Sequence, residues 1–188
     1  MKYLFFLFIT LLTVSNDFYA QNAIKTITEG VLLVRLQTNE HLIKYYTEND
    51  MLNKAKIEKE KQAKLNKEVM HTFQTTWSLC PVYFFYSNSY HEIKRNDFKN
   101  VFNYQNEALS AENLKSLKNN FLIAYIGDTH GTLKFNALVL TNQYLKTLPR
   151  PYPRYVRTYD GFLFLKRKLR KSIQILEKKI NFQLSRIK

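Results

Sequence analysis

The sequence predicts a single-domain α/β fold, in which a mixed four-stranded sheet is flanked by helices. Two observations lead to this prediction. Short apolar segments without period-2 alternation indicate strands that are covered on both faces. Helical patterns separate them, in the order strand, helix, strand, helix, strand, strand, helix. The densest apolar segment, residues 79–86, is expected to form the strand at the centre of the sheet.

The first half of the chain begins with a strand expected at residues 30–36, which are rich in valine and leucine. A long helical region follows it, with a break expected near Asn49 and Asp50. Its middle, residues 54–68, holds six lysines and three glutamates with few apolar residues, so it is expected to project into solvent. After the central strand, a second helix is predicted over residues 88–102 and a short one over 110–117.

The second half contains two further strands, predicted at residues 121–126 and 135–141. The turn-like residues 127–131 between them are few, so the two strands are expected to be antiparallel. Three prolines within residues 149–153 require an extended backbone, and residues 155–158 are a candidate for a short edge strand. The last helix is predicted from about Gly161, with an apolar stripe that runs from Leu165 to Ile187.

The predicted order of elements resembles the thioredoxin-like fold, with two parallel strands followed by an antiparallel hairpin. The chain departs from that family at its active site. Thr38-Asn39-Glu40-His41 stands where the family has Cys-x-x-Cys, and no proline precedes the third strand, where Lys118-Asn119-Asn120 stands. The resemblance therefore implies a fold and does not imply redox chemistry.

The N-terminus has the pattern of a secretory signal peptide. One lysine is followed by a short apolar segment, and cleavage is expected after Ala20, which leaves residues 21–188 as the domain. The Tyr19-Ala20-Gln21 ending resembles signal peptides of exported Bacteroidota proteins. An uncleaved anchor is the alternative. The protein is thus expected to be periplasmic or secreted, with no transmembrane segment after cleavage.

The charge is strongly asymmetric. The net charge is +14, and residues 146–188 hold thirteen Lys or Arg against Asp160 and Glu177. For an exported protein, such a basic segment makes an anionic lipid, an acidic polysaccharide or an envelope protein the expected partner. Nucleic acid is a less favoured partner.

The candidate binding residues lie in this basic segment. Its proline-rich part alternates arginine, which binds phosphate and carboxylate groups with two hydrogen bonds, and tyrosine, which offers flat contact area. A structural role remains the alternative, in which the segment wraps the domain and the last helix packs on the sheet. The candidate ligand-binding residues are Arg150, Tyr152, Arg154, Tyr155, Arg157, Lys166, Arg167 and Arg170.

Catalytic motifs are weak in this sequence. The single cysteine, Cys80, is expected to be buried, and His41, His71, His91 and His130 lack metal-ligand spacing. Asp128 and His130 could orient a base, but they fit a hairpin turn equally well. The chain has no Gly-rich phosphate loop, no Gly-x-Ser-x-Gly and no His-Glu-x-x-His. No catalytic residue, cofactor or metal is therefore predicted.

The sequence favours a non-catalytic binding protein for an anionic envelope ligand or partner. Two alternatives stay open. The first is an enzyme, either a degenerate thioredoxin-like redox protein that uses Cys80 or a hydrolase that uses Asp128 and His130. The second is a structural or assembly protein of the cell envelope, with residues 54–68 as its docking element.

Overall fold

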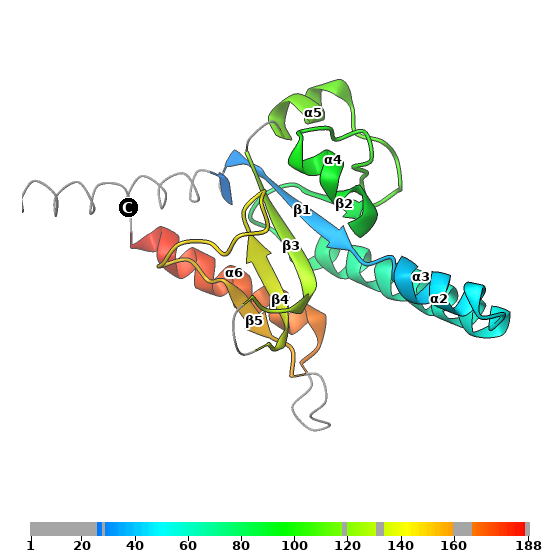
Figure 1. The fold of residues 1–188 in the computed structure, drawn as a ribbon. Coiled ribbons are helices and arrows are strands. Elements are labelled where there is room, and N and C mark those ends of the chain that lie inside the picture. The colour runs from blue at the N-terminus through cyan, green and yellow to red at the C-terminus, as the bar shows by residue number, and fades with distance from the viewer. Residues whose placement is uncertain (1–25, 28, 118–119, 131–133, 160–166, 187–188) are drawn as a thin grey trace, which may run out of the picture.

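A computed structural model describes residues 26–27, 29–117, 120–130, 134–159 and 167–186. The predicted signal peptide lies outside these residues. They form a five-stranded mixed sheet with helices on both faces (Figure 1). The strands are β1 (Val31–Leu36), β2 (Val82–Tyr86), β3 (Phe121–Asp128), β4 (Asn136–Thr141) and β5 (Tyr155–Arg157). The helices are α2 (Glu40–Glu48), α3 (Leu52–Thr76), the 3₁₀ turn η1 (Ser87–Ser89), α4 (Tyr90–Lys94), α5 (Ala111–Leu117) and α6 (Leu169–Ser185).

The strand order is β2-β1-β3-β4-β5. β1 pairs in parallel with both β2 and β3, which brings Arg35 between Phe85 and Tyr125. β4 and β5 then add two antiparallel strands. The α/β class predicted from the sequence is confirmed, whereas the number of strands in the sheet is five rather than four.

The additional strand is β5. The prolines before it keep the backbone extended, so the chain returns along β4 and pairs with it. The amide of Leu140 donates to the carbonyl of Arg154 at 2.9 Å, and the amide of Thr158 donates to the carbonyl of Asn136 at 3.1 Å. The short edge strand for which residues 155–158 are a candidate is therefore present, and it is the strand that the predicted four-stranded sheet lacks.

The strand expected at the centre of the sheet is instead at its edge. β2 covers only Val82–Tyr86 and has β1 as its one neighbour in the sheet, whereas β3 occupies the middle. Its outer side is protected by an isolated bridge, in which the amides and carbonyls of Phe84 and Phe102 pair at 2.8 and 3.0 Å. This bridge explains why an edge strand is as apolar as a central one.

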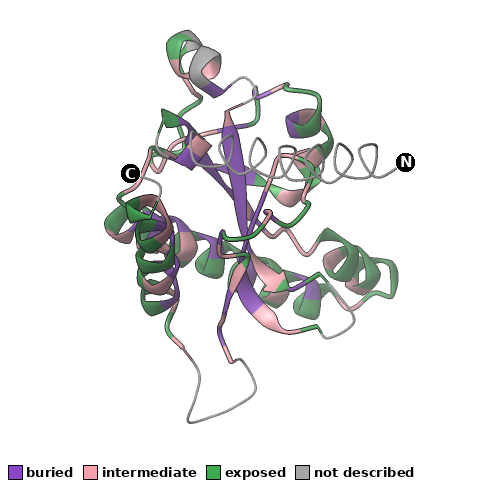
Figure 2. Ribbon diagram, turned by 90° about the vertical axis from the view of Figure 1, so that its left-hand side faces the viewer, coloured by how far each residue is buried: buried purple, intermediate pink, exposed green. Residues whose placement is uncertain are grey.

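Two hydrophobic cores cover the two faces of the sheet. Figure 2 shows the consequence, since buried residues are concentrated in the strands, whereas the helices also have exposed residues. On one face, α3 and α6 pack on alternate residues of the strands, such as Leu32, Val34 and Leu36 of β1. On the other face, α4 and α5 cover Val31 and Leu33 of β1 and their neighbours. The helical residues that face the first core include Met70, Phe73, Ile173, Leu176 and Ile180, and those that face the second include Ile93 and Leu117.

The helices differ from the predicted ones in length. The long helical region breaks as expected, since Asp50 has φ of 55° and separates α2 from α3. The helix predicted over residues 88–102 is reduced to η1 and α4, because Asn96 with φ of 60° ends the helical path and Phe102 pairs with Phe84 instead. α6 starts at Leu169, and the residues 160–166 before it are not described.

The lysine-rich helix α3 and its neighbour α2 form a hairpin at one end of the molecule (Figure 1). α2 has no buried residue, and the first half of α3 buries little beyond Ala55 and Gln62. The solvent-facing helix expected at residues 54–68 is therefore present. In the part of the chain that is described, no helix combines the length and the apolarity that crossing a membrane requires.

Candidate functional site

The parallel strands create a natural place for a site at their carboxyl ends. The connection from β1 to β2 passes through α2 and α3 on one face of the sheet, whereas the connection from β2 to β3 passes through α4 and α5 on the other. The two crossovers run in opposite directions, the first from β1 outward to β2 and the second from β2 back past β1 to β3. In open α/β sheets, ligands bind outside the carboxyl ends of the strands at such a switch point.

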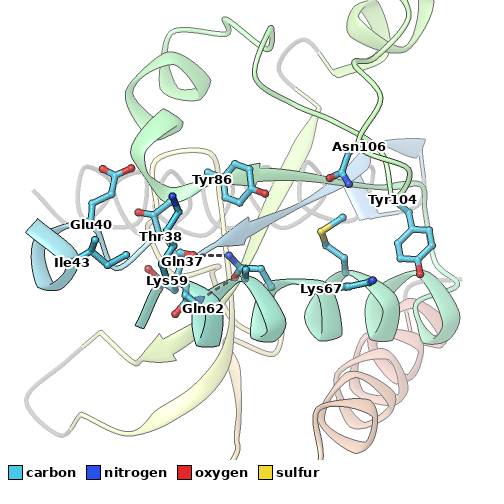
Figure 3. Close-up of a pocket in the computed structure, with 13 residues that line it drawn as sticks. Gln37, Thr38, Glu40, Ile43, Lys59, Gln62, Lys67, Tyr86, Tyr104 and Asn106 are labelled. Carbon is cyan, nitrogen blue, oxygen red and sulfur yellow. Dashed lines mark hydrogen bonds between the residues drawn. The ribbon is translucent and has the colours of Figure 1, made fainter. Parts of the chain in front are cut away.

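A groove of about 670 Å³ lies at this edge, on the face that α3 covers (Figure 3). We refer to it as the α3 groove. One side of α3 forms its floor, because Lys59, Gln62, Ala63, Asn66, Lys67 and Met70 recur at the three- and four-residue spacing of a helix face. The remaining lining residues are Gln37, Thr38, Glu40, Ile43, Tyr86, Tyr104 and Asn106.

Side-chain amides hold the floor of the α3 groove in place. Gln62 and Asn66 are only 8% and 9% exposed. Gln62 Nε2 donates to Asn66 Oδ1 at 3.0 Å, and Asn66 Nδ2 donates to the carbonyl of Gln37 at 2.8 Å. Asn39 Nδ2, at the start of α2, donates to Gln62 Oε1 at 2.9 Å. This chain of amides fixes α3 to the end of β1 and so sets the width of the groove.

Two tyrosines border the α3 groove, one from β2 and one from the segment after Phe102 (Figure 3). Tyr86 is 40% exposed, and its ring lies 5.2 Å from that of Phe102. The Tyr104 hydroxyl is hydrogen-bonded to His71 Nδ1 at 3.2 Å. These contacts restrict the rotation of both tyrosine side chains. The rings therefore offer flat surface at the groove, and their side chains lose little conformational entropy on binding.

The charged groups at the α3 groove are predominantly positive. Lys59 and Lys67 are exposed, and neither makes an ion pair with another residue that the structure describes. The one acidic residue of the lining, Glu40, accepts a hydrogen bond from Asn88 Nδ2 at 2.7 Å. The lining therefore has an excess of positive charge, and its two exposed ammonium groups are available to an anion.

The candidate binding residues of the basic segment do not form one surface. Tyr152 is 3% exposed and packs in the core beneath α6, whereas Tyr155 packs on the opposite face of the sheet. Arg150 and Arg170 are exposed. Lys166 lies outside the described residues.

The other arginines of that segment are engaged within the domain. Arg154 Nε donates to the carbonyl of Leu148 at 3.2 Å. The Arg157 guanidinium lies 3.7 Å from the centre of the Phe135 ring. Arg167 donates to the carbonyl of Arg157 at 2.6 Å. These contacts match the alternative in which the segment wraps the domain.

The candidates for catalysis are also separated. Cys80 is half-buried, and burial raises the pKa of its thiol, which keeps it protonated at neutral pH. His130 is exposed, and its Nε2 lies 3.0 Å from the Tyr125 hydroxyl, whereas the side chain of the exposed Asp128 makes no hydrogen bond with the His130 ring. Within the described ranges, no group of three or more His, Cys, Asp or Glu side chains could hold a metal ion.

Comparisons with known proteins add no assignment. The chain matches no protein-family model, and neither the curated proteins nor the solved structures give a significant match. The thioredoxin-like resemblance accordingly stays a prediction, and the function has to be argued from the geometry of this chain.

Proposed function

We propose that this protein is an exported, non-catalytic binding protein whose ligand is an acidic sugar held in the α3 groove. The observation that carries the proposal is the composition of the groove. An amide floor, two tyrosine rings that contact neighbouring residues, and two lysines without an ion-pair partner among the described residues line one concave surface. Export rests on the signal-peptide pattern of residues 1–20.

Each part of the α3 groove matches one part of such a ligand. The side-chain amides of Gln37 and Asn106, which also line the groove and are less buried than its floor, can both donate and accept hydrogen bonds, which suits the hydroxyl groups of a sugar. Tyrosine rings offer flat apolar surface against which a sugar ring can pack. Ammonium groups at the edge attract the carboxylates of a uronic acid. This combination favours an acidic sugar over a purely apolar ligand.

The lining of the α3 groove favours binding over catalysis. It contains no histidine or cysteine, and its one carboxylate, that of Glu40, is held by Asn88. A nucleophile beside a general base is therefore missing from the residues that line it. The rival redox function loses support as well, because the raised pKa of Cys80 leaves little thiolate.

Charge removal at the α3 groove tests the proposal. The substitutions Lys59→Gln and Lys67→Gln together should weaken binding of a uronic-acid tetrasaccharide by at least about 10-fold, since both ammonium groups contact it. The matched control is Lys56→Gln with Lys64→Gln, which removes the same charge from exposed positions of α3 outside the groove. Titration calorimetry at physiological salt measures both.

Two outcomes would contradict the proposal. If both double variants lose the same affinity, the net charge of +14 attracts the sugar without a site. If a neutral tetrasaccharide binds as tightly as the acidic one, Lys59 and Lys67 do not contribute to binding through the carboxylates of the sugar. The expected result is a preference for the acidic sugar that only the variant in the groove abolishes.

A further inference from the structure

Arg35 is the charged residue in a strand that is otherwise apolar. Val31 to Val34 and Leu36 of β1 are buried, and Arg35 itself is half-buried. Its cross-strand neighbours are Phe85 on β2 and Tyr125 on β3. The side chain therefore lies on the face of the sheet opposite the α3 groove, at the carboxyl end of β1.

The Arg35 guanidinium has no partner among the residues that the structure describes. Its Nε is buried and makes no hydrogen bond with any described residue. No acidic residue of the described ranges forms an ion pair with it. A guanidinium stays charged and carries five N–H donors. Burying half of it without an acceptor costs desolvation free energy that no contact offsets, which is unusual in a native domain. Such a group calls for a structural explanation.

Two tyrosines flank Arg35 in place of a carboxylate. Burial raises the pKa of Tyr125 and that of Tyr90, the first residue of α4, and the charge of Arg35 offsets only part of this increase. Both hydroxyls therefore stay protonated at neutral pH. The Tyr125 hydroxyl also contacts His130 Nε2 at 3.0 Å. The Tyr125 hydroxyl also donates to the carbonyl of Asp128, and the Tyr90 hydroxyl donates to the carbonyl of Gln143, each at 3.4 Å. The surroundings of Arg35 thus contain neutral hydroxyls, and the exposed Asp128, whose charge acts on Tyr125, forms no ion pair with the guanidinium.

The position of Arg35 in the fold is one where ligands bind. Arg35 and Tyr125 lie on the adjacent strands β1 and β3, between which the direction of the crossovers changes. α4 and α5 cover the sheet on one side of this pair. On the other side, Leu145 and Tyr155 cover Ala137 and Val139 of β4. Arg35 stands at the junction of these two covered areas.

We propose that Arg35 forms an oxyanion-binding site, in which its guanidinium fork binds a carboxylate or phosphate group of a small molecule and the hydroxyls of Tyr90 and Tyr125 lie beside it. The fork of an arginine matches both groups, with two parallel hydrogen bonds. The bound oxyanion supplies the acceptors that no described residue gives to the Arg35 guanidinium. This site is independent of the α3 groove, from which the sheet separates it.

Thermal unfolding with two probes tests the site. Inorganic phosphate and succinate, each at about 10 mM and at ionic strength matched with sodium chloride, should raise the Tm of the wild-type protein, since a ligand that binds only the folded state stabilises it. A shift with phosphate alone assigns a phosphate site, and a shift with succinate alone assigns a carboxylate site. No shift with either probe overturns the proposal.

Variants separate the site from general attraction of anions. Arg35→Met should abolish the Tm shift, whereas Arg170→Met, which removes an exposed arginine of α6, should keep it. Arg35→Lys retains the charge and loses the fork, so it should lose most of the shift even if Arg35→Met fails to fold. A full shift in either Arg35 variant would disprove the assignment. The double variant Lys59→Gln with Lys67→Gln should show the same increase in Tm with phosphate or succinate as the wild-type protein.

Discussion

Gly30 precedes β1 at a point where two backbone carbonyls leave no room for a side chain. A Cβ there would lie closer than 3.0 Å to the carbonyl oxygens of Thr26 and Asn120. Both carbonyls are fixed, because they accept hydrogen bonds from the amides of Gly30 and Val31 at 3.1 Å. We expect Gly30→Ala to lower the free energy of unfolding by about 2 kcal/mol or more, through backbone displacement at the start of β1.

Gly127 provides the control for this prediction. A Cβ at Gly127 would meet the Tyr125 ring at 3.6 Å, which is an ordinary van der Waals contact. Gly127→Ala should therefore change the free energy of unfolding by less than about 1 kcal/mol, and urea denaturation of both variants measures the difference. Equal losses for the two substitutions would show that the space around Gly30 is not the cause.

Single residues also show where sequence reasoning reached its limit. The charge count drew attention to Arg150, Arg154 and Arg157, yet the structure uses two of these for contacts within the domain. Arg35 attracts less attention, although a lone arginine in an apolar strand is visible in the sequence. Arg35 is notable because its cross-strand neighbours, Phe85 and Tyr125, are not acidic. Strand pairing determines these neighbours, and the composition of the sequence does not reveal them.

At the scale of elements, the contact of α3 with the end of β1 depends on Asn66. Its amide connects Gln62 to the carbonyl of Gln37, with distances of 3.0 and 2.8 Å. Asn66→Ala would leave the buried amide of Gln62 and the half-buried Gln37 without these hydrogen bonds. We expect a loss of about 1–3 kcal/mol in the free energy of unfolding. Asn53→Ala, at an exposed position of the same helix, should lower the free energy of unfolding much less than Asn66→Ala does, if it lowers it at all.

Urea denaturation of the two asparagine variants distinguishes a structural amide from a helix-propensity effect. Alanine is the better helix former, so propensity alone would stabilise both variants slightly. A stable Asn66→Ala protein would therefore mean that water replaces the amide at no cost. In that case, the amide chain would not set the width of the α3 groove.

Elements were predictable where local pattern decides them. The hairpin of β3 and β4 and the break between α2 and α3 follow from short-range signals that the structure retains. The place of β2 at the edge of the sheet did not follow, because a strand covered by the Phe102 bridge has the same composition as a central one. The α3 groove was missed for a related reason, since Tyr104 reaches it only through the pairing of Phe102.

At the scale of the whole molecule, charge is distributed differently from what the sequence suggests. Residues 146–188 carry most of the net charge of +14, and they also supply the apolar side of α6 that covers one face of the sheet. Ile173, Leu176 and Ile180 are fully buried there. The basic segment is thus an integral part of the fold, and removing it would expose the core rather than delete a binding tail.

The stability of the domain should fall in alkaline solution. Burial raises the pKa of Cys80, Tyr90, Tyr125 and Tyr152 in the folded protein. As pH rises, the unfolded chain loses these protons first, so it binds fewer protons than the folded chain and the free energy of unfolding decreases. The loss should begin near the ordinary cysteine pKa of about 8.5 and steepen above the ordinary tyrosine pKa of about 10. Urea denaturation at a series of pH values measures it.

Tyr152→Phe isolates the contribution of one buried hydroxyl to this decline. Tyr152 is 3% exposed, and its hydroxyl has no hydrogen-bond partner among the described residues, so the substitution should cost little at neutral pH. Above about pH 10, the variant should lose less stability than the wild type, because phenylalanine has no proton to release. Lysine deprotonation reduces repulsion within this basic protein equally in both. Parallel curves for the two proteins would therefore show that the Tyr152 hydroxyl ionises in the folded state as readily as in the unfolded chain.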